Sequence, residues 1–183
     1  MRYYHYWPDV EHFGYLRFVE KFTHEEGFPI SGQFHQGVSL LNTWQPVSLK
    51  ADTRHGKLGD FPKAQVGPPV VSQRAWSVLR PLLGEDVEAL PVVVPQGEYL
   101  ALNILSIIDC LDYECSEVTW FPHGSLHDIT KYCLKPGLAE RHSMFKIPEE
   151  MTYAIVTEEF RQAINEAGLE GLSFHNMIYD PGE

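Results

Sequence analysis

The sequence predicts an α+β fold in a single domain, with a mostly antiparallel sheet and a few packed helices. Short apolar and β-branched runs, separated by turn residues, recur through the middle of the chain. Two amphipathic segments begin with residues that cap helices. The 183 residues show no internal repeat and no interdomain linker, and a chain of this length is expected to bury one sizeable core.

Residues 1–69 are predicted to be the loop-rich N-terminal part of the single domain, and residues 70–175 the part that contains both helices and most of the strands. Aromatic side chains crowd the first seven positions ahead of Pro8, which predicts an edge strand that packs mainly in the core (Tyr3, Tyr4, Tyr6 and Trp7). Pro and Gly recur over residues 28–69, so loops that recognise a partner are expected there. Trp44, beside Pro46, is as compatible with a core position as with an interface anchor.

A first helix is predicted to follow Ser72, whose hydroxyl can accept a hydrogen bond from a backbone N–H of the first turn. Pro81 is expected to end or kink this helix, and Gly84 to form its exit. Apolar residues recur along it with helical spacing, at Ala75, Val78, Leu79 and Leu82.

A second helix is predicted to begin after Thr157, with Glu158 and Glu159 in its first turn, where the helix dipole favours negative charge. Gly168 is expected to end it. The predicted buried stripe consists of Phe160, Ala163, Ile164 and Ala167.

Strands are predicted between the two helices. Residues 90–94 and 98–104 flank the turn Pro95-Gln96-Gly97 and are expected to form a hairpin. Further strand candidates are residues 107–111, where a helix is equally compatible with the pattern, and residues 118–121, 129–134 and 144–147. A last strand is expected at residues 172–174.

The net charge of −11 is concentrated in the middle of the chain. Residues 81–130 contain no Lys or Arg and nine acidic residues: Glu85, Asp86, Glu88, Glu98, Asp109, Asp112, Glu114, Glu117 and Asp128. This distribution argues against nucleic acid as a direct partner, because phosphate binding needs a basic surface. It suits a basic protein partner, whose approach an acidic face can steer, although solubility accounts for an acidic composition equally well.

The sequence indicates a cytoplasmic protein with no membrane partner. The longest apolar stretch, residues 99–108, is about half the length that a membrane span needs. The first residues lack the apolar run of a signal peptide. Three cysteines are an odd number for a disulfide framework, so we expect reduced thiols (Cys110, Cys115 and Cys133).

Catalytic motifs are absent from the sequence, and we expect no catalytic residue, metal or cofactor. His123 and His127 could share a zinc ion, but Pro122 and Gly124 argue against a regular helix there. The pair Asp109 and Asp112 could serve acid–base chemistry or bind a divalent ion. The same two carboxylates could instead cap a turn or belong to an acidic contact surface.

Several short segments occur in an order that resembles immunity protein family eleven of bacterial polymorphic toxin systems, long described as a domain of unknown function. They are VVS at 70–72, VEALPV at 87–92, Tyr99, LNI at 102–104, IDCLD at 108–112, FKI at 145–147, IVTEEF at 155–160 and AGLEGLSF at 167–174. The resemblance covers residues 70–174 and implies a protein that protects its producer from a toxin. It transfers no catalytic residue to this chain.

The resemblance and the charge distribution together favour a protein that binds and neutralises a cognate toxin in the cytoplasm by masking it, and the charge suits a basic toxin. The residues expected to face the toxin are Trp44, Asp109, Asp112, Glu114 and Glu117. The alternative is a small hydrolytic or metal-dependent enzyme that uses Asp109 and Asp112 or the histidine pair His123 and His127. A third hypothesis is a module that dimerises through an aromatic edge; the sequence leaves the oligomeric state open.

Overall fold

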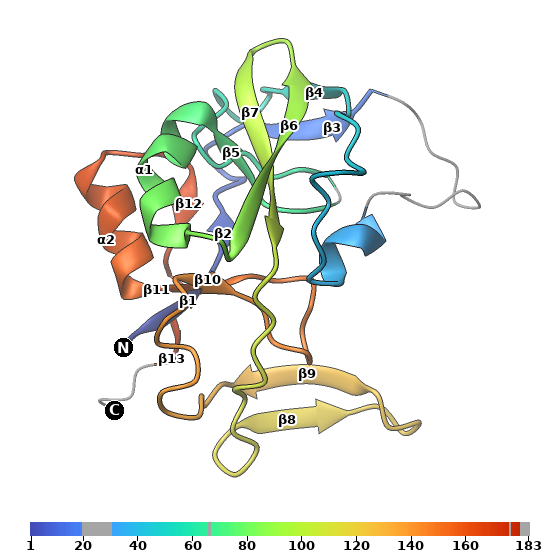
Figure 1. Cartoon of the computed structure of the whole chain (residues 1–183), viewed down its shortest axis with the longest axis vertical. Helices are drawn as coiled ribbons and strands as arrows, with labels where there is room; N and C mark the ends of the chain where they lie inside the picture. The colour runs from blue at the N-terminus through green and yellow to red at the C-terminus, as the bar shows by residue number, and fades with distance from the viewer. Residues whose placement is uncertain (20–30, 66, 176, 180–183) are drawn as a thin grey trace.

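A computed structural model describes residues 1–19, 31–65, 67–175 and 177–179. Two α-helices and several small sheets make up the described chain, and every ladder between its named strands is antiparallel (Figure 1). The predicted α+β fold class is therefore confirmed. No helix in the described residues is long and apolar enough to cross a membrane. The start of the predicted recognition region, residues 28–30, and position 66 lie outside the described residues.

A four-stranded sheet at the centre of the molecule joins both ends of the chain. Its order is β10 (Met144–Phe145), β11 (Ile155–Thr157), β1 (Tyr3–His5) and β13 (Met177–Tyr179). The prediction that the N-terminal strand is an edge strand is wrong, because β11 and β13 both pair with β1. These partners follow β1 by about 150 residues (β11) and about 175 residues (β13), separations at which the pattern of a single segment carries no information.

Alternate residues of this sheet enter two different cores. Tyr4 and Val156 face the first cluster, which also contains both helices, whereas Tyr3 and Ile155 face a second cluster on the other side. Because successive side chains of a strand point to opposite faces, a sheet that is buried on both faces needs apolar residues at every position. The predicted core position of the aromatic run is confirmed for Tyr3, Tyr4 and Tyr6, whereas Trp7 is 40% exposed.

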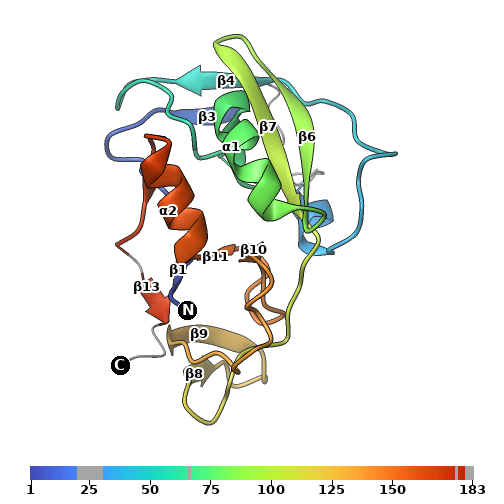
Figure 2. The same ribbon diagram turned by 60° about the vertical axis from the view of Figure 1, so that its left-hand side comes forward.

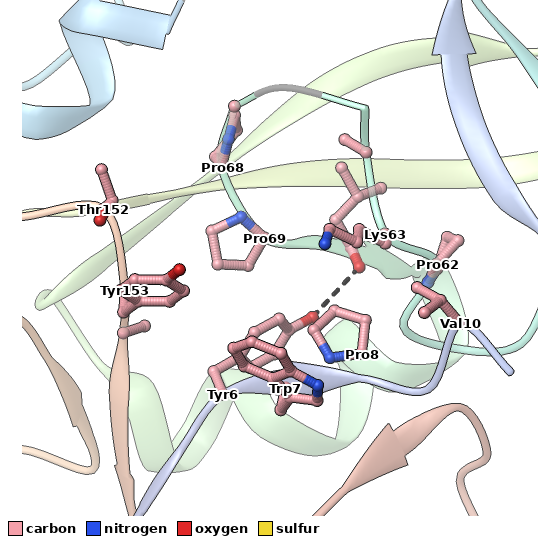
Figure 3. Close-up of a pocket in the computed structure, with 14 residues that line it drawn as sticks. Tyr6, Trp7, Pro8, Val10, Pro62, Lys63, Pro68, Pro69, Thr152 and Tyr153 are labelled. Atoms are coloured by element: carbon pink, nitrogen blue, oxygen red, sulfur yellow. Dashed lines mark hydrogen bonds between the residues drawn. The ribbon is translucent and has the colours of Figure 1, made fainter. Parts of the chain in front are cut away.

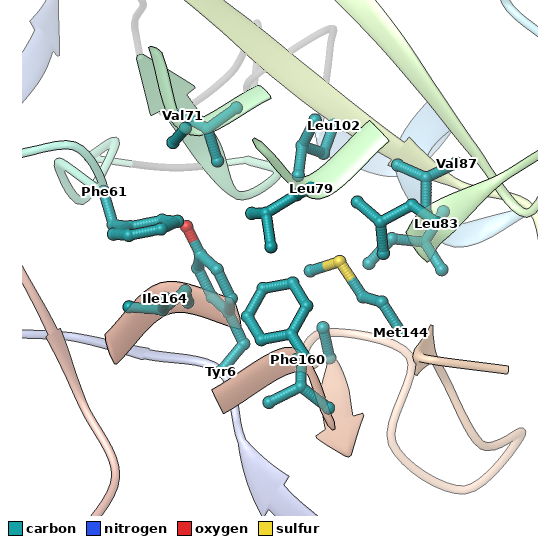
Figure 4. Close-up of a cluster of buried hydrophobic side chains, with 14 of the residues drawn as sticks. Tyr6, Phe61, Val71, Leu79, Leu83, Val87, Leu102, Met144, Phe160 and Ile164 are labelled. Atoms are coloured by element: carbon teal, nitrogen blue, oxygen red, sulfur yellow. The ribbon is translucent and has the colours of Figure 1, made fainter. Parts of the chain in front are cut away.

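The first cluster forms where α1 (Gln73–Leu83) packs on β5 (Val70–Ser72) and β7 (Gly97–Ile104), and α2 (Glu158–Glu166) packs on α1 and β11. Val87 of β6 (Val87–Val94) also belongs to it (Figure 4). Both predicted N-caps are confirmed: Ser72 Oγ accepts from the N–H of Ala75 at 3.0 Å, and Thr157 Oγ1 from the N–H of Phe160 at 3.4 Å. The buried side chains of α1 are Ala75, Leu79 and Leu83, and those of α2 are Phe160 and Ile164.

Pro81 does not end the first helix, which was one of the two outcomes predicted for it, and the predicted exit at Gly84 is confirmed. The helix continues to Leu83, and Gly84 then leaves it with a φ of 54° and donates its N–H to the carbonyl of Arg80 at 3.1 Å. A proline in the last turn removes a single intrahelical hydrogen bond, and the positive φ that glycine tolerates provides the actual end.

The predicted hairpin is confirmed as β6 and β7, which pair in full register from Val87↔Ile104 to Val94↔Gly97. One face of this hairpin covers a third cluster, together with β3 (Tyr15–Phe18), β4 (Leu49–Asp52) and the 3-10 helix η1 (Ser31–His35). The short strands β2 (Trp7–Pro8) and β12 (Leu172–Ser173) pair segments from near the two ends of the chain, and β12 confirms the last predicted strand.

A second hairpin, β8 (Glu117–Trp120) with β9 (Leu126–Lys131), forms one end of the molecule, away from both helices (Figures 1 and 2). The strand predicted at residues 129–134 therefore begins three residues earlier. Residues 107–111 form neither the strand nor the helix that their pattern allowed; they make only the isolated bridges Ile107↔Lys146 and Leu111↔Leu134.

Lys146 is buried, at 3% exposure, and its Nζ donates a hydrogen bond of 2.9 Å to the carbonyl of Phe34. Burial lowers the pKa of Lys146 from 10.5 to about 8. The folded protein therefore disfavours the ammonium form, and this costs about 3 kcal/mol of stability at pH 7. The cost disappears as the pH rises from 8 towards 10.5.

Replacing Lys146 with Met is expected to raise the free energy of unfolding by about 2 kcal/mol at pH 7, since the lost hydrogen bond offsets part of the gain. Near pH 10 the same variant should be no more stable than the wild type. Urea denaturation at both pH values measures this, with Lys131→Met on exposed β9 as the control. A Lys146→Met variant that is destabilised equally at both pH values would contradict the prediction.

Candidate protein-interaction surface

Residues 109–128, here called the acidic tip, form the far end of the molecule with the β8–β9 hairpin (Figure 2). They contain no Lys or Arg. The carboxylate of Asp109 is 76% exposed, and Glu114, Glu117 and Asp128 are exposed as well. Four of the five residues predicted to face a toxin therefore lie on one continuous segment (Asp109, Asp112, Glu114 and Glu117).

Asp112 shapes the turn that presents these carboxylates. Its Oδ1 accepts from the N–H of Glu114 at 3.0 Å, and its carbonyl accepts from the N–H of Ser116 at 2.9 Å. Ser116 Oγ in turn accepts from the N–H of Cys133 at 2.9 Å and thereby ties the turn to the chain after β9. This is the turn-capping role that the sequence allowed for Asp112.

Exposed aromatic rings lie among the carboxylates of the acidic tip, and the sequence analysis did not identify them. Tyr113 and Trp120 stack with ring centroids 6.3 Å apart and an interplanar angle of 24°, and they are 49% and 53% exposed. The hydroxyl of Tyr113 donates to Glu149 at 2.6 Å, and this hydrogen bond raises the pKa of Tyr113 to about 12. Glu149, which lies outside the acidic tip, therefore fixes the position of the Tyr113 ring in this stack.

The rest of the acidic block, residues 81–108, does not belong to this surface. Glu88 accepts hydrogen bonds of 2.9 Å from the N–H of Leu40 and from the amide of Asn103, so it joins two segments inside the fold. The carboxylate of Asp86 lies 2.8 Å from Nδ1 of His142. The acidic residues of positions 81–130 are therefore divided between internal contacts, exposed positions elsewhere such as Glu98, and the acidic tip.

The structure does not bring Trp44 together with the acidic tip. Its indole N–H donates to the carbonyl of Pro91 at 2.8 Å, and its ring packs edge-on against Phe34 with centroids 5.5 Å apart. These contacts belong to the third cluster, whereas the residues that anchor the tip belong to the second. Trp44 is half-buried and supports the packing of the η1 segment against β6.

The groups considered for catalysis are not assembled for it in the described chain. His123 stacks on Phe121 with centroids 5.4 Å apart, and His127 meets the same ring edge-on at 4.5 Å. Within the described ranges, no three His, Cys, Asp or Glu side chains are grouped to hold a metal ion. Asp109 is paired loosely with Lys135, at 3.8 Å.

The cysteine thiols are unsuited to nucleophilic chemistry. All three cysteines are free, and Cys110 and Cys133 are buried. Burial raises the pKa of Cys110 to about 11, and a hydrogen bond with Cys133 raises the pKa of exposed Cys115 to about 11. A thiol with a raised pKa carries almost no reactive thiolate at neutral pH.

A pocket of about 160 Å³ lies away from the acidic tip, between β2, residues 62–64, residues 67–70 and residues 152–154 (Figure 3). None of the fourteen described residues that line it is a His, Cys, Asp or Glu. Lys63 is the one charged side chain among these lining residues.

Comparison with known proteins identifies the chain by family. No curated protein matches the sequence at a significant level. Residues 15–178 match the immunity protein family Imm11. This match begins 55 residues before the segments that carried the resemblance, so it includes most of the loop-rich N-terminal part, for which the sequence analysis named no relative. It spans most of the 183 residues. The chain belongs to the Imm11 immunity protein family.

Proposed function

We propose that this protein binds a cognate bacterial toxin in the cytoplasm and neutralises it by masking its surface, without catalysis of its own. Membership in the Imm11 family supports an immunity role. The observation that supports a particular surface is the acidic tip, where exposed carboxylates lie on the same segment as the exposed, stacked rings of Tyr113 and Trp120.

The composition of the tip suits contact with a basic protein. Tyr and Trp are the residues that most often dominate the energetics of protein interfaces, because each buries a large area at a small entropic cost. Carboxylates around them accelerate the approach of a positively charged partner. Cationic side chains can also rest on the faces of exposed aromatic rings. The proposed partner surface is therefore rich in Arg and Lys.

Co-expression with the product of the neighbouring open reading frame tests the immunity role. We expect the protein to restore the growth of cells that express this toxin and to co-purify with it as a stable complex. Absence of a complex at micromolar concentrations, together with absence of growth rescue, would refute the proposal for this pair of proteins.

Charge reversal tests the acidic tip as the contact surface. Glu114→Lys combined with Glu117→Lys should slow association with the toxin by roughly tenfold at low salt, because the steering field at the tip is lost. Stopped-flow fluorescence or surface plasmon resonance measures this rate.

A matched control changes the net charge by the same amount elsewhere. Glu98, at the turn of the β6–β7 hairpin, and Glu166, at the end of α2, are both exposed. Glu98→Lys with Glu166→Lys should slow association much less than the tip variant. Equal slowing by both pairs would show that only the overall charge matters and would contradict the acidic tip as the contact surface.

A further inference from the structure

The pocket beside Trp7 has the size of a single aromatic ring. Its volume of about 160 Å³ is close to the roughly 150 Å³ of a protein cavity that holds benzene. Its rim is open, since Trp7 and Tyr153 are 40% and 41% exposed. A small ligand can therefore enter without a change in the fold.

Rigid rings line much of the pocket, beside polar groups such as Thr152 and Lys63. Trp7 and Tyr153 stack with centroids 5.9 Å apart and an interplanar angle of 19°. A ring inserted between them would need about 7 Å, twice the contact distance of stacked carbons, so a ligand must lie against this pair and not within it. Prolines with fixed backbone angles line the other sides: Pro8, Pro62, Pro68 and Pro69 (Figure 3).

The pocket carries a positive charge in a strongly acidic protein. Lys63 is the one ionised side chain among the described lining residues, and its Nζ lies 5.9 Å from the centre of the Trp7 ring. No carboxylate of the described chain lies within ion-pair distance of Lys63. An anionic group at the rim would therefore find an unneutralised ammonium beside an apolar surface.

We propose that this pocket binds a small aromatic carboxylate, with the ring against Trp7 and Tyr153 and the carboxylate paired with Lys63. Neither the family match nor the proposed immunity role requires such a ligand. The pocket shares no described residue with the acidic tip, so binding here and binding of a toxin can succeed or fail independently.

Isothermal titration and ligand-observed NMR on the full chain test the proposal with phenylacetate as the probe. Phenylacetate should bind at least tenfold more tightly than phenethylamine, which has the same ring and the opposite charge. Acetate, which lacks the ring, should show no saturable binding. Equal affinity for phenylacetate and phenethylamine, or no binding of phenylacetate at millimolar concentration, would overturn the assignment.

Variants locate the binding. Lys63→Gln should remove the preference for phenylacetate over phenethylamine, and Trp7→Ala should weaken phenylacetate binding by tenfold or more. Trp120→Ala, at the acidic tip, should leave it unchanged; circular dichroism checks that each variant is folded. An acetylated peptide that ends in phenylalanine offers the same ring and carboxylate. Binding of this peptide more than tenfold tighter than phenylacetate would show that the pocket serves a protein terminus, and would overturn the small-molecule assignment.

Discussion

Replacing Phe160 with Ala is expected to lower the free energy of unfolding by about 3–5 kcal/mol. The Phe160 side chain is fully buried at the first turn of α2, in the cluster where both helices meet the β5–β7–β6 sheet (Figure 4). Removing the ring leaves a cavity. The side chains around it belong to several closely packed elements, so they cannot move far enough to fill it. Domains of this kind are typically stable by only about 5–15 kcal/mol, so much of the total would be lost.

A substitution at the neighbouring position of the same helix is a matched control for Phe160→Ala. Glu159→Ala changes the preceding residue, which is exposed, and leaves the capping bond from Thr157 to the N–H of Phe160 in place. It should change stability by less than about 0.5 kcal/mol. Urea denaturation of both variants gives the comparison. A loss below about 1.5 kcal/mol for Phe160→Ala would mean that the helix is not packed as the structure shows.

Local signals predicted the elements whose hydrogen bonds are local. Ser72 and Thr157 were identifiable as helix caps because the residues that they cap follow within three positions. The β6–β7 hairpin was predictable for the same reason, since its two strands are joined by a two-residue turn. In each case the sequence contains both partners of the interaction within one short window.

Long-range pairing was not predictable from pattern. Strand β1 reads as an edge strand because its partners, β11 and β13, lie at the other end of the chain. The short strand β13 carries no periodic signal in its three residues. Glu88 looked like a surface charge among other acidic residues, but it binds the N–H of Leu40, 48 residues earlier. Each of these contacts depends on how distant segments meet.

The candidate site was predictable to the extent that it is continuous in sequence. Asp109, Asp112, Glu114 and Glu117 stay together in the structure because a single turn holds them. Trp44 was grouped with them by residue type alone, and it packs in another part of the fold. Aromatic residues between the acidic ones were a signal in the sequence that could have identified the exposed rings of the tip. The hydrogen bond from Tyr113 to Glu149 could not be predicted, because the two residues are 36 positions apart.

Trp120 is the residue of the acidic tip whose loss should weaken toxin binding most. Trp120→Ala is expected to raise the dissociation constant about thirtyfold, since a central interface tryptophan contributes about 2 kcal/mol or more when it is truncated. Its ring is 53% exposed, so the variant should retain nearly all of the stability of the free protein. Titration calorimetry against the toxin, with thermal denaturation of the free protein, measures both effects.

The rate constant that changes shows whether a residue holds the formed complex or steers the approach of the toxin. A buried aromatic anchor holds the formed complex, so Trp120→Ala should act mainly through faster dissociation, whereas the Glu114→Lys and Glu117→Lys pair should act mainly through slower association. Trp7→Ala, which removes an exposed tryptophan at the distant pocket, is the control and should change neither rate. If Trp120→Ala left the dissociation rate unchanged, Trp120 would lie outside the interface even if the acidic residues steer the toxin towards it.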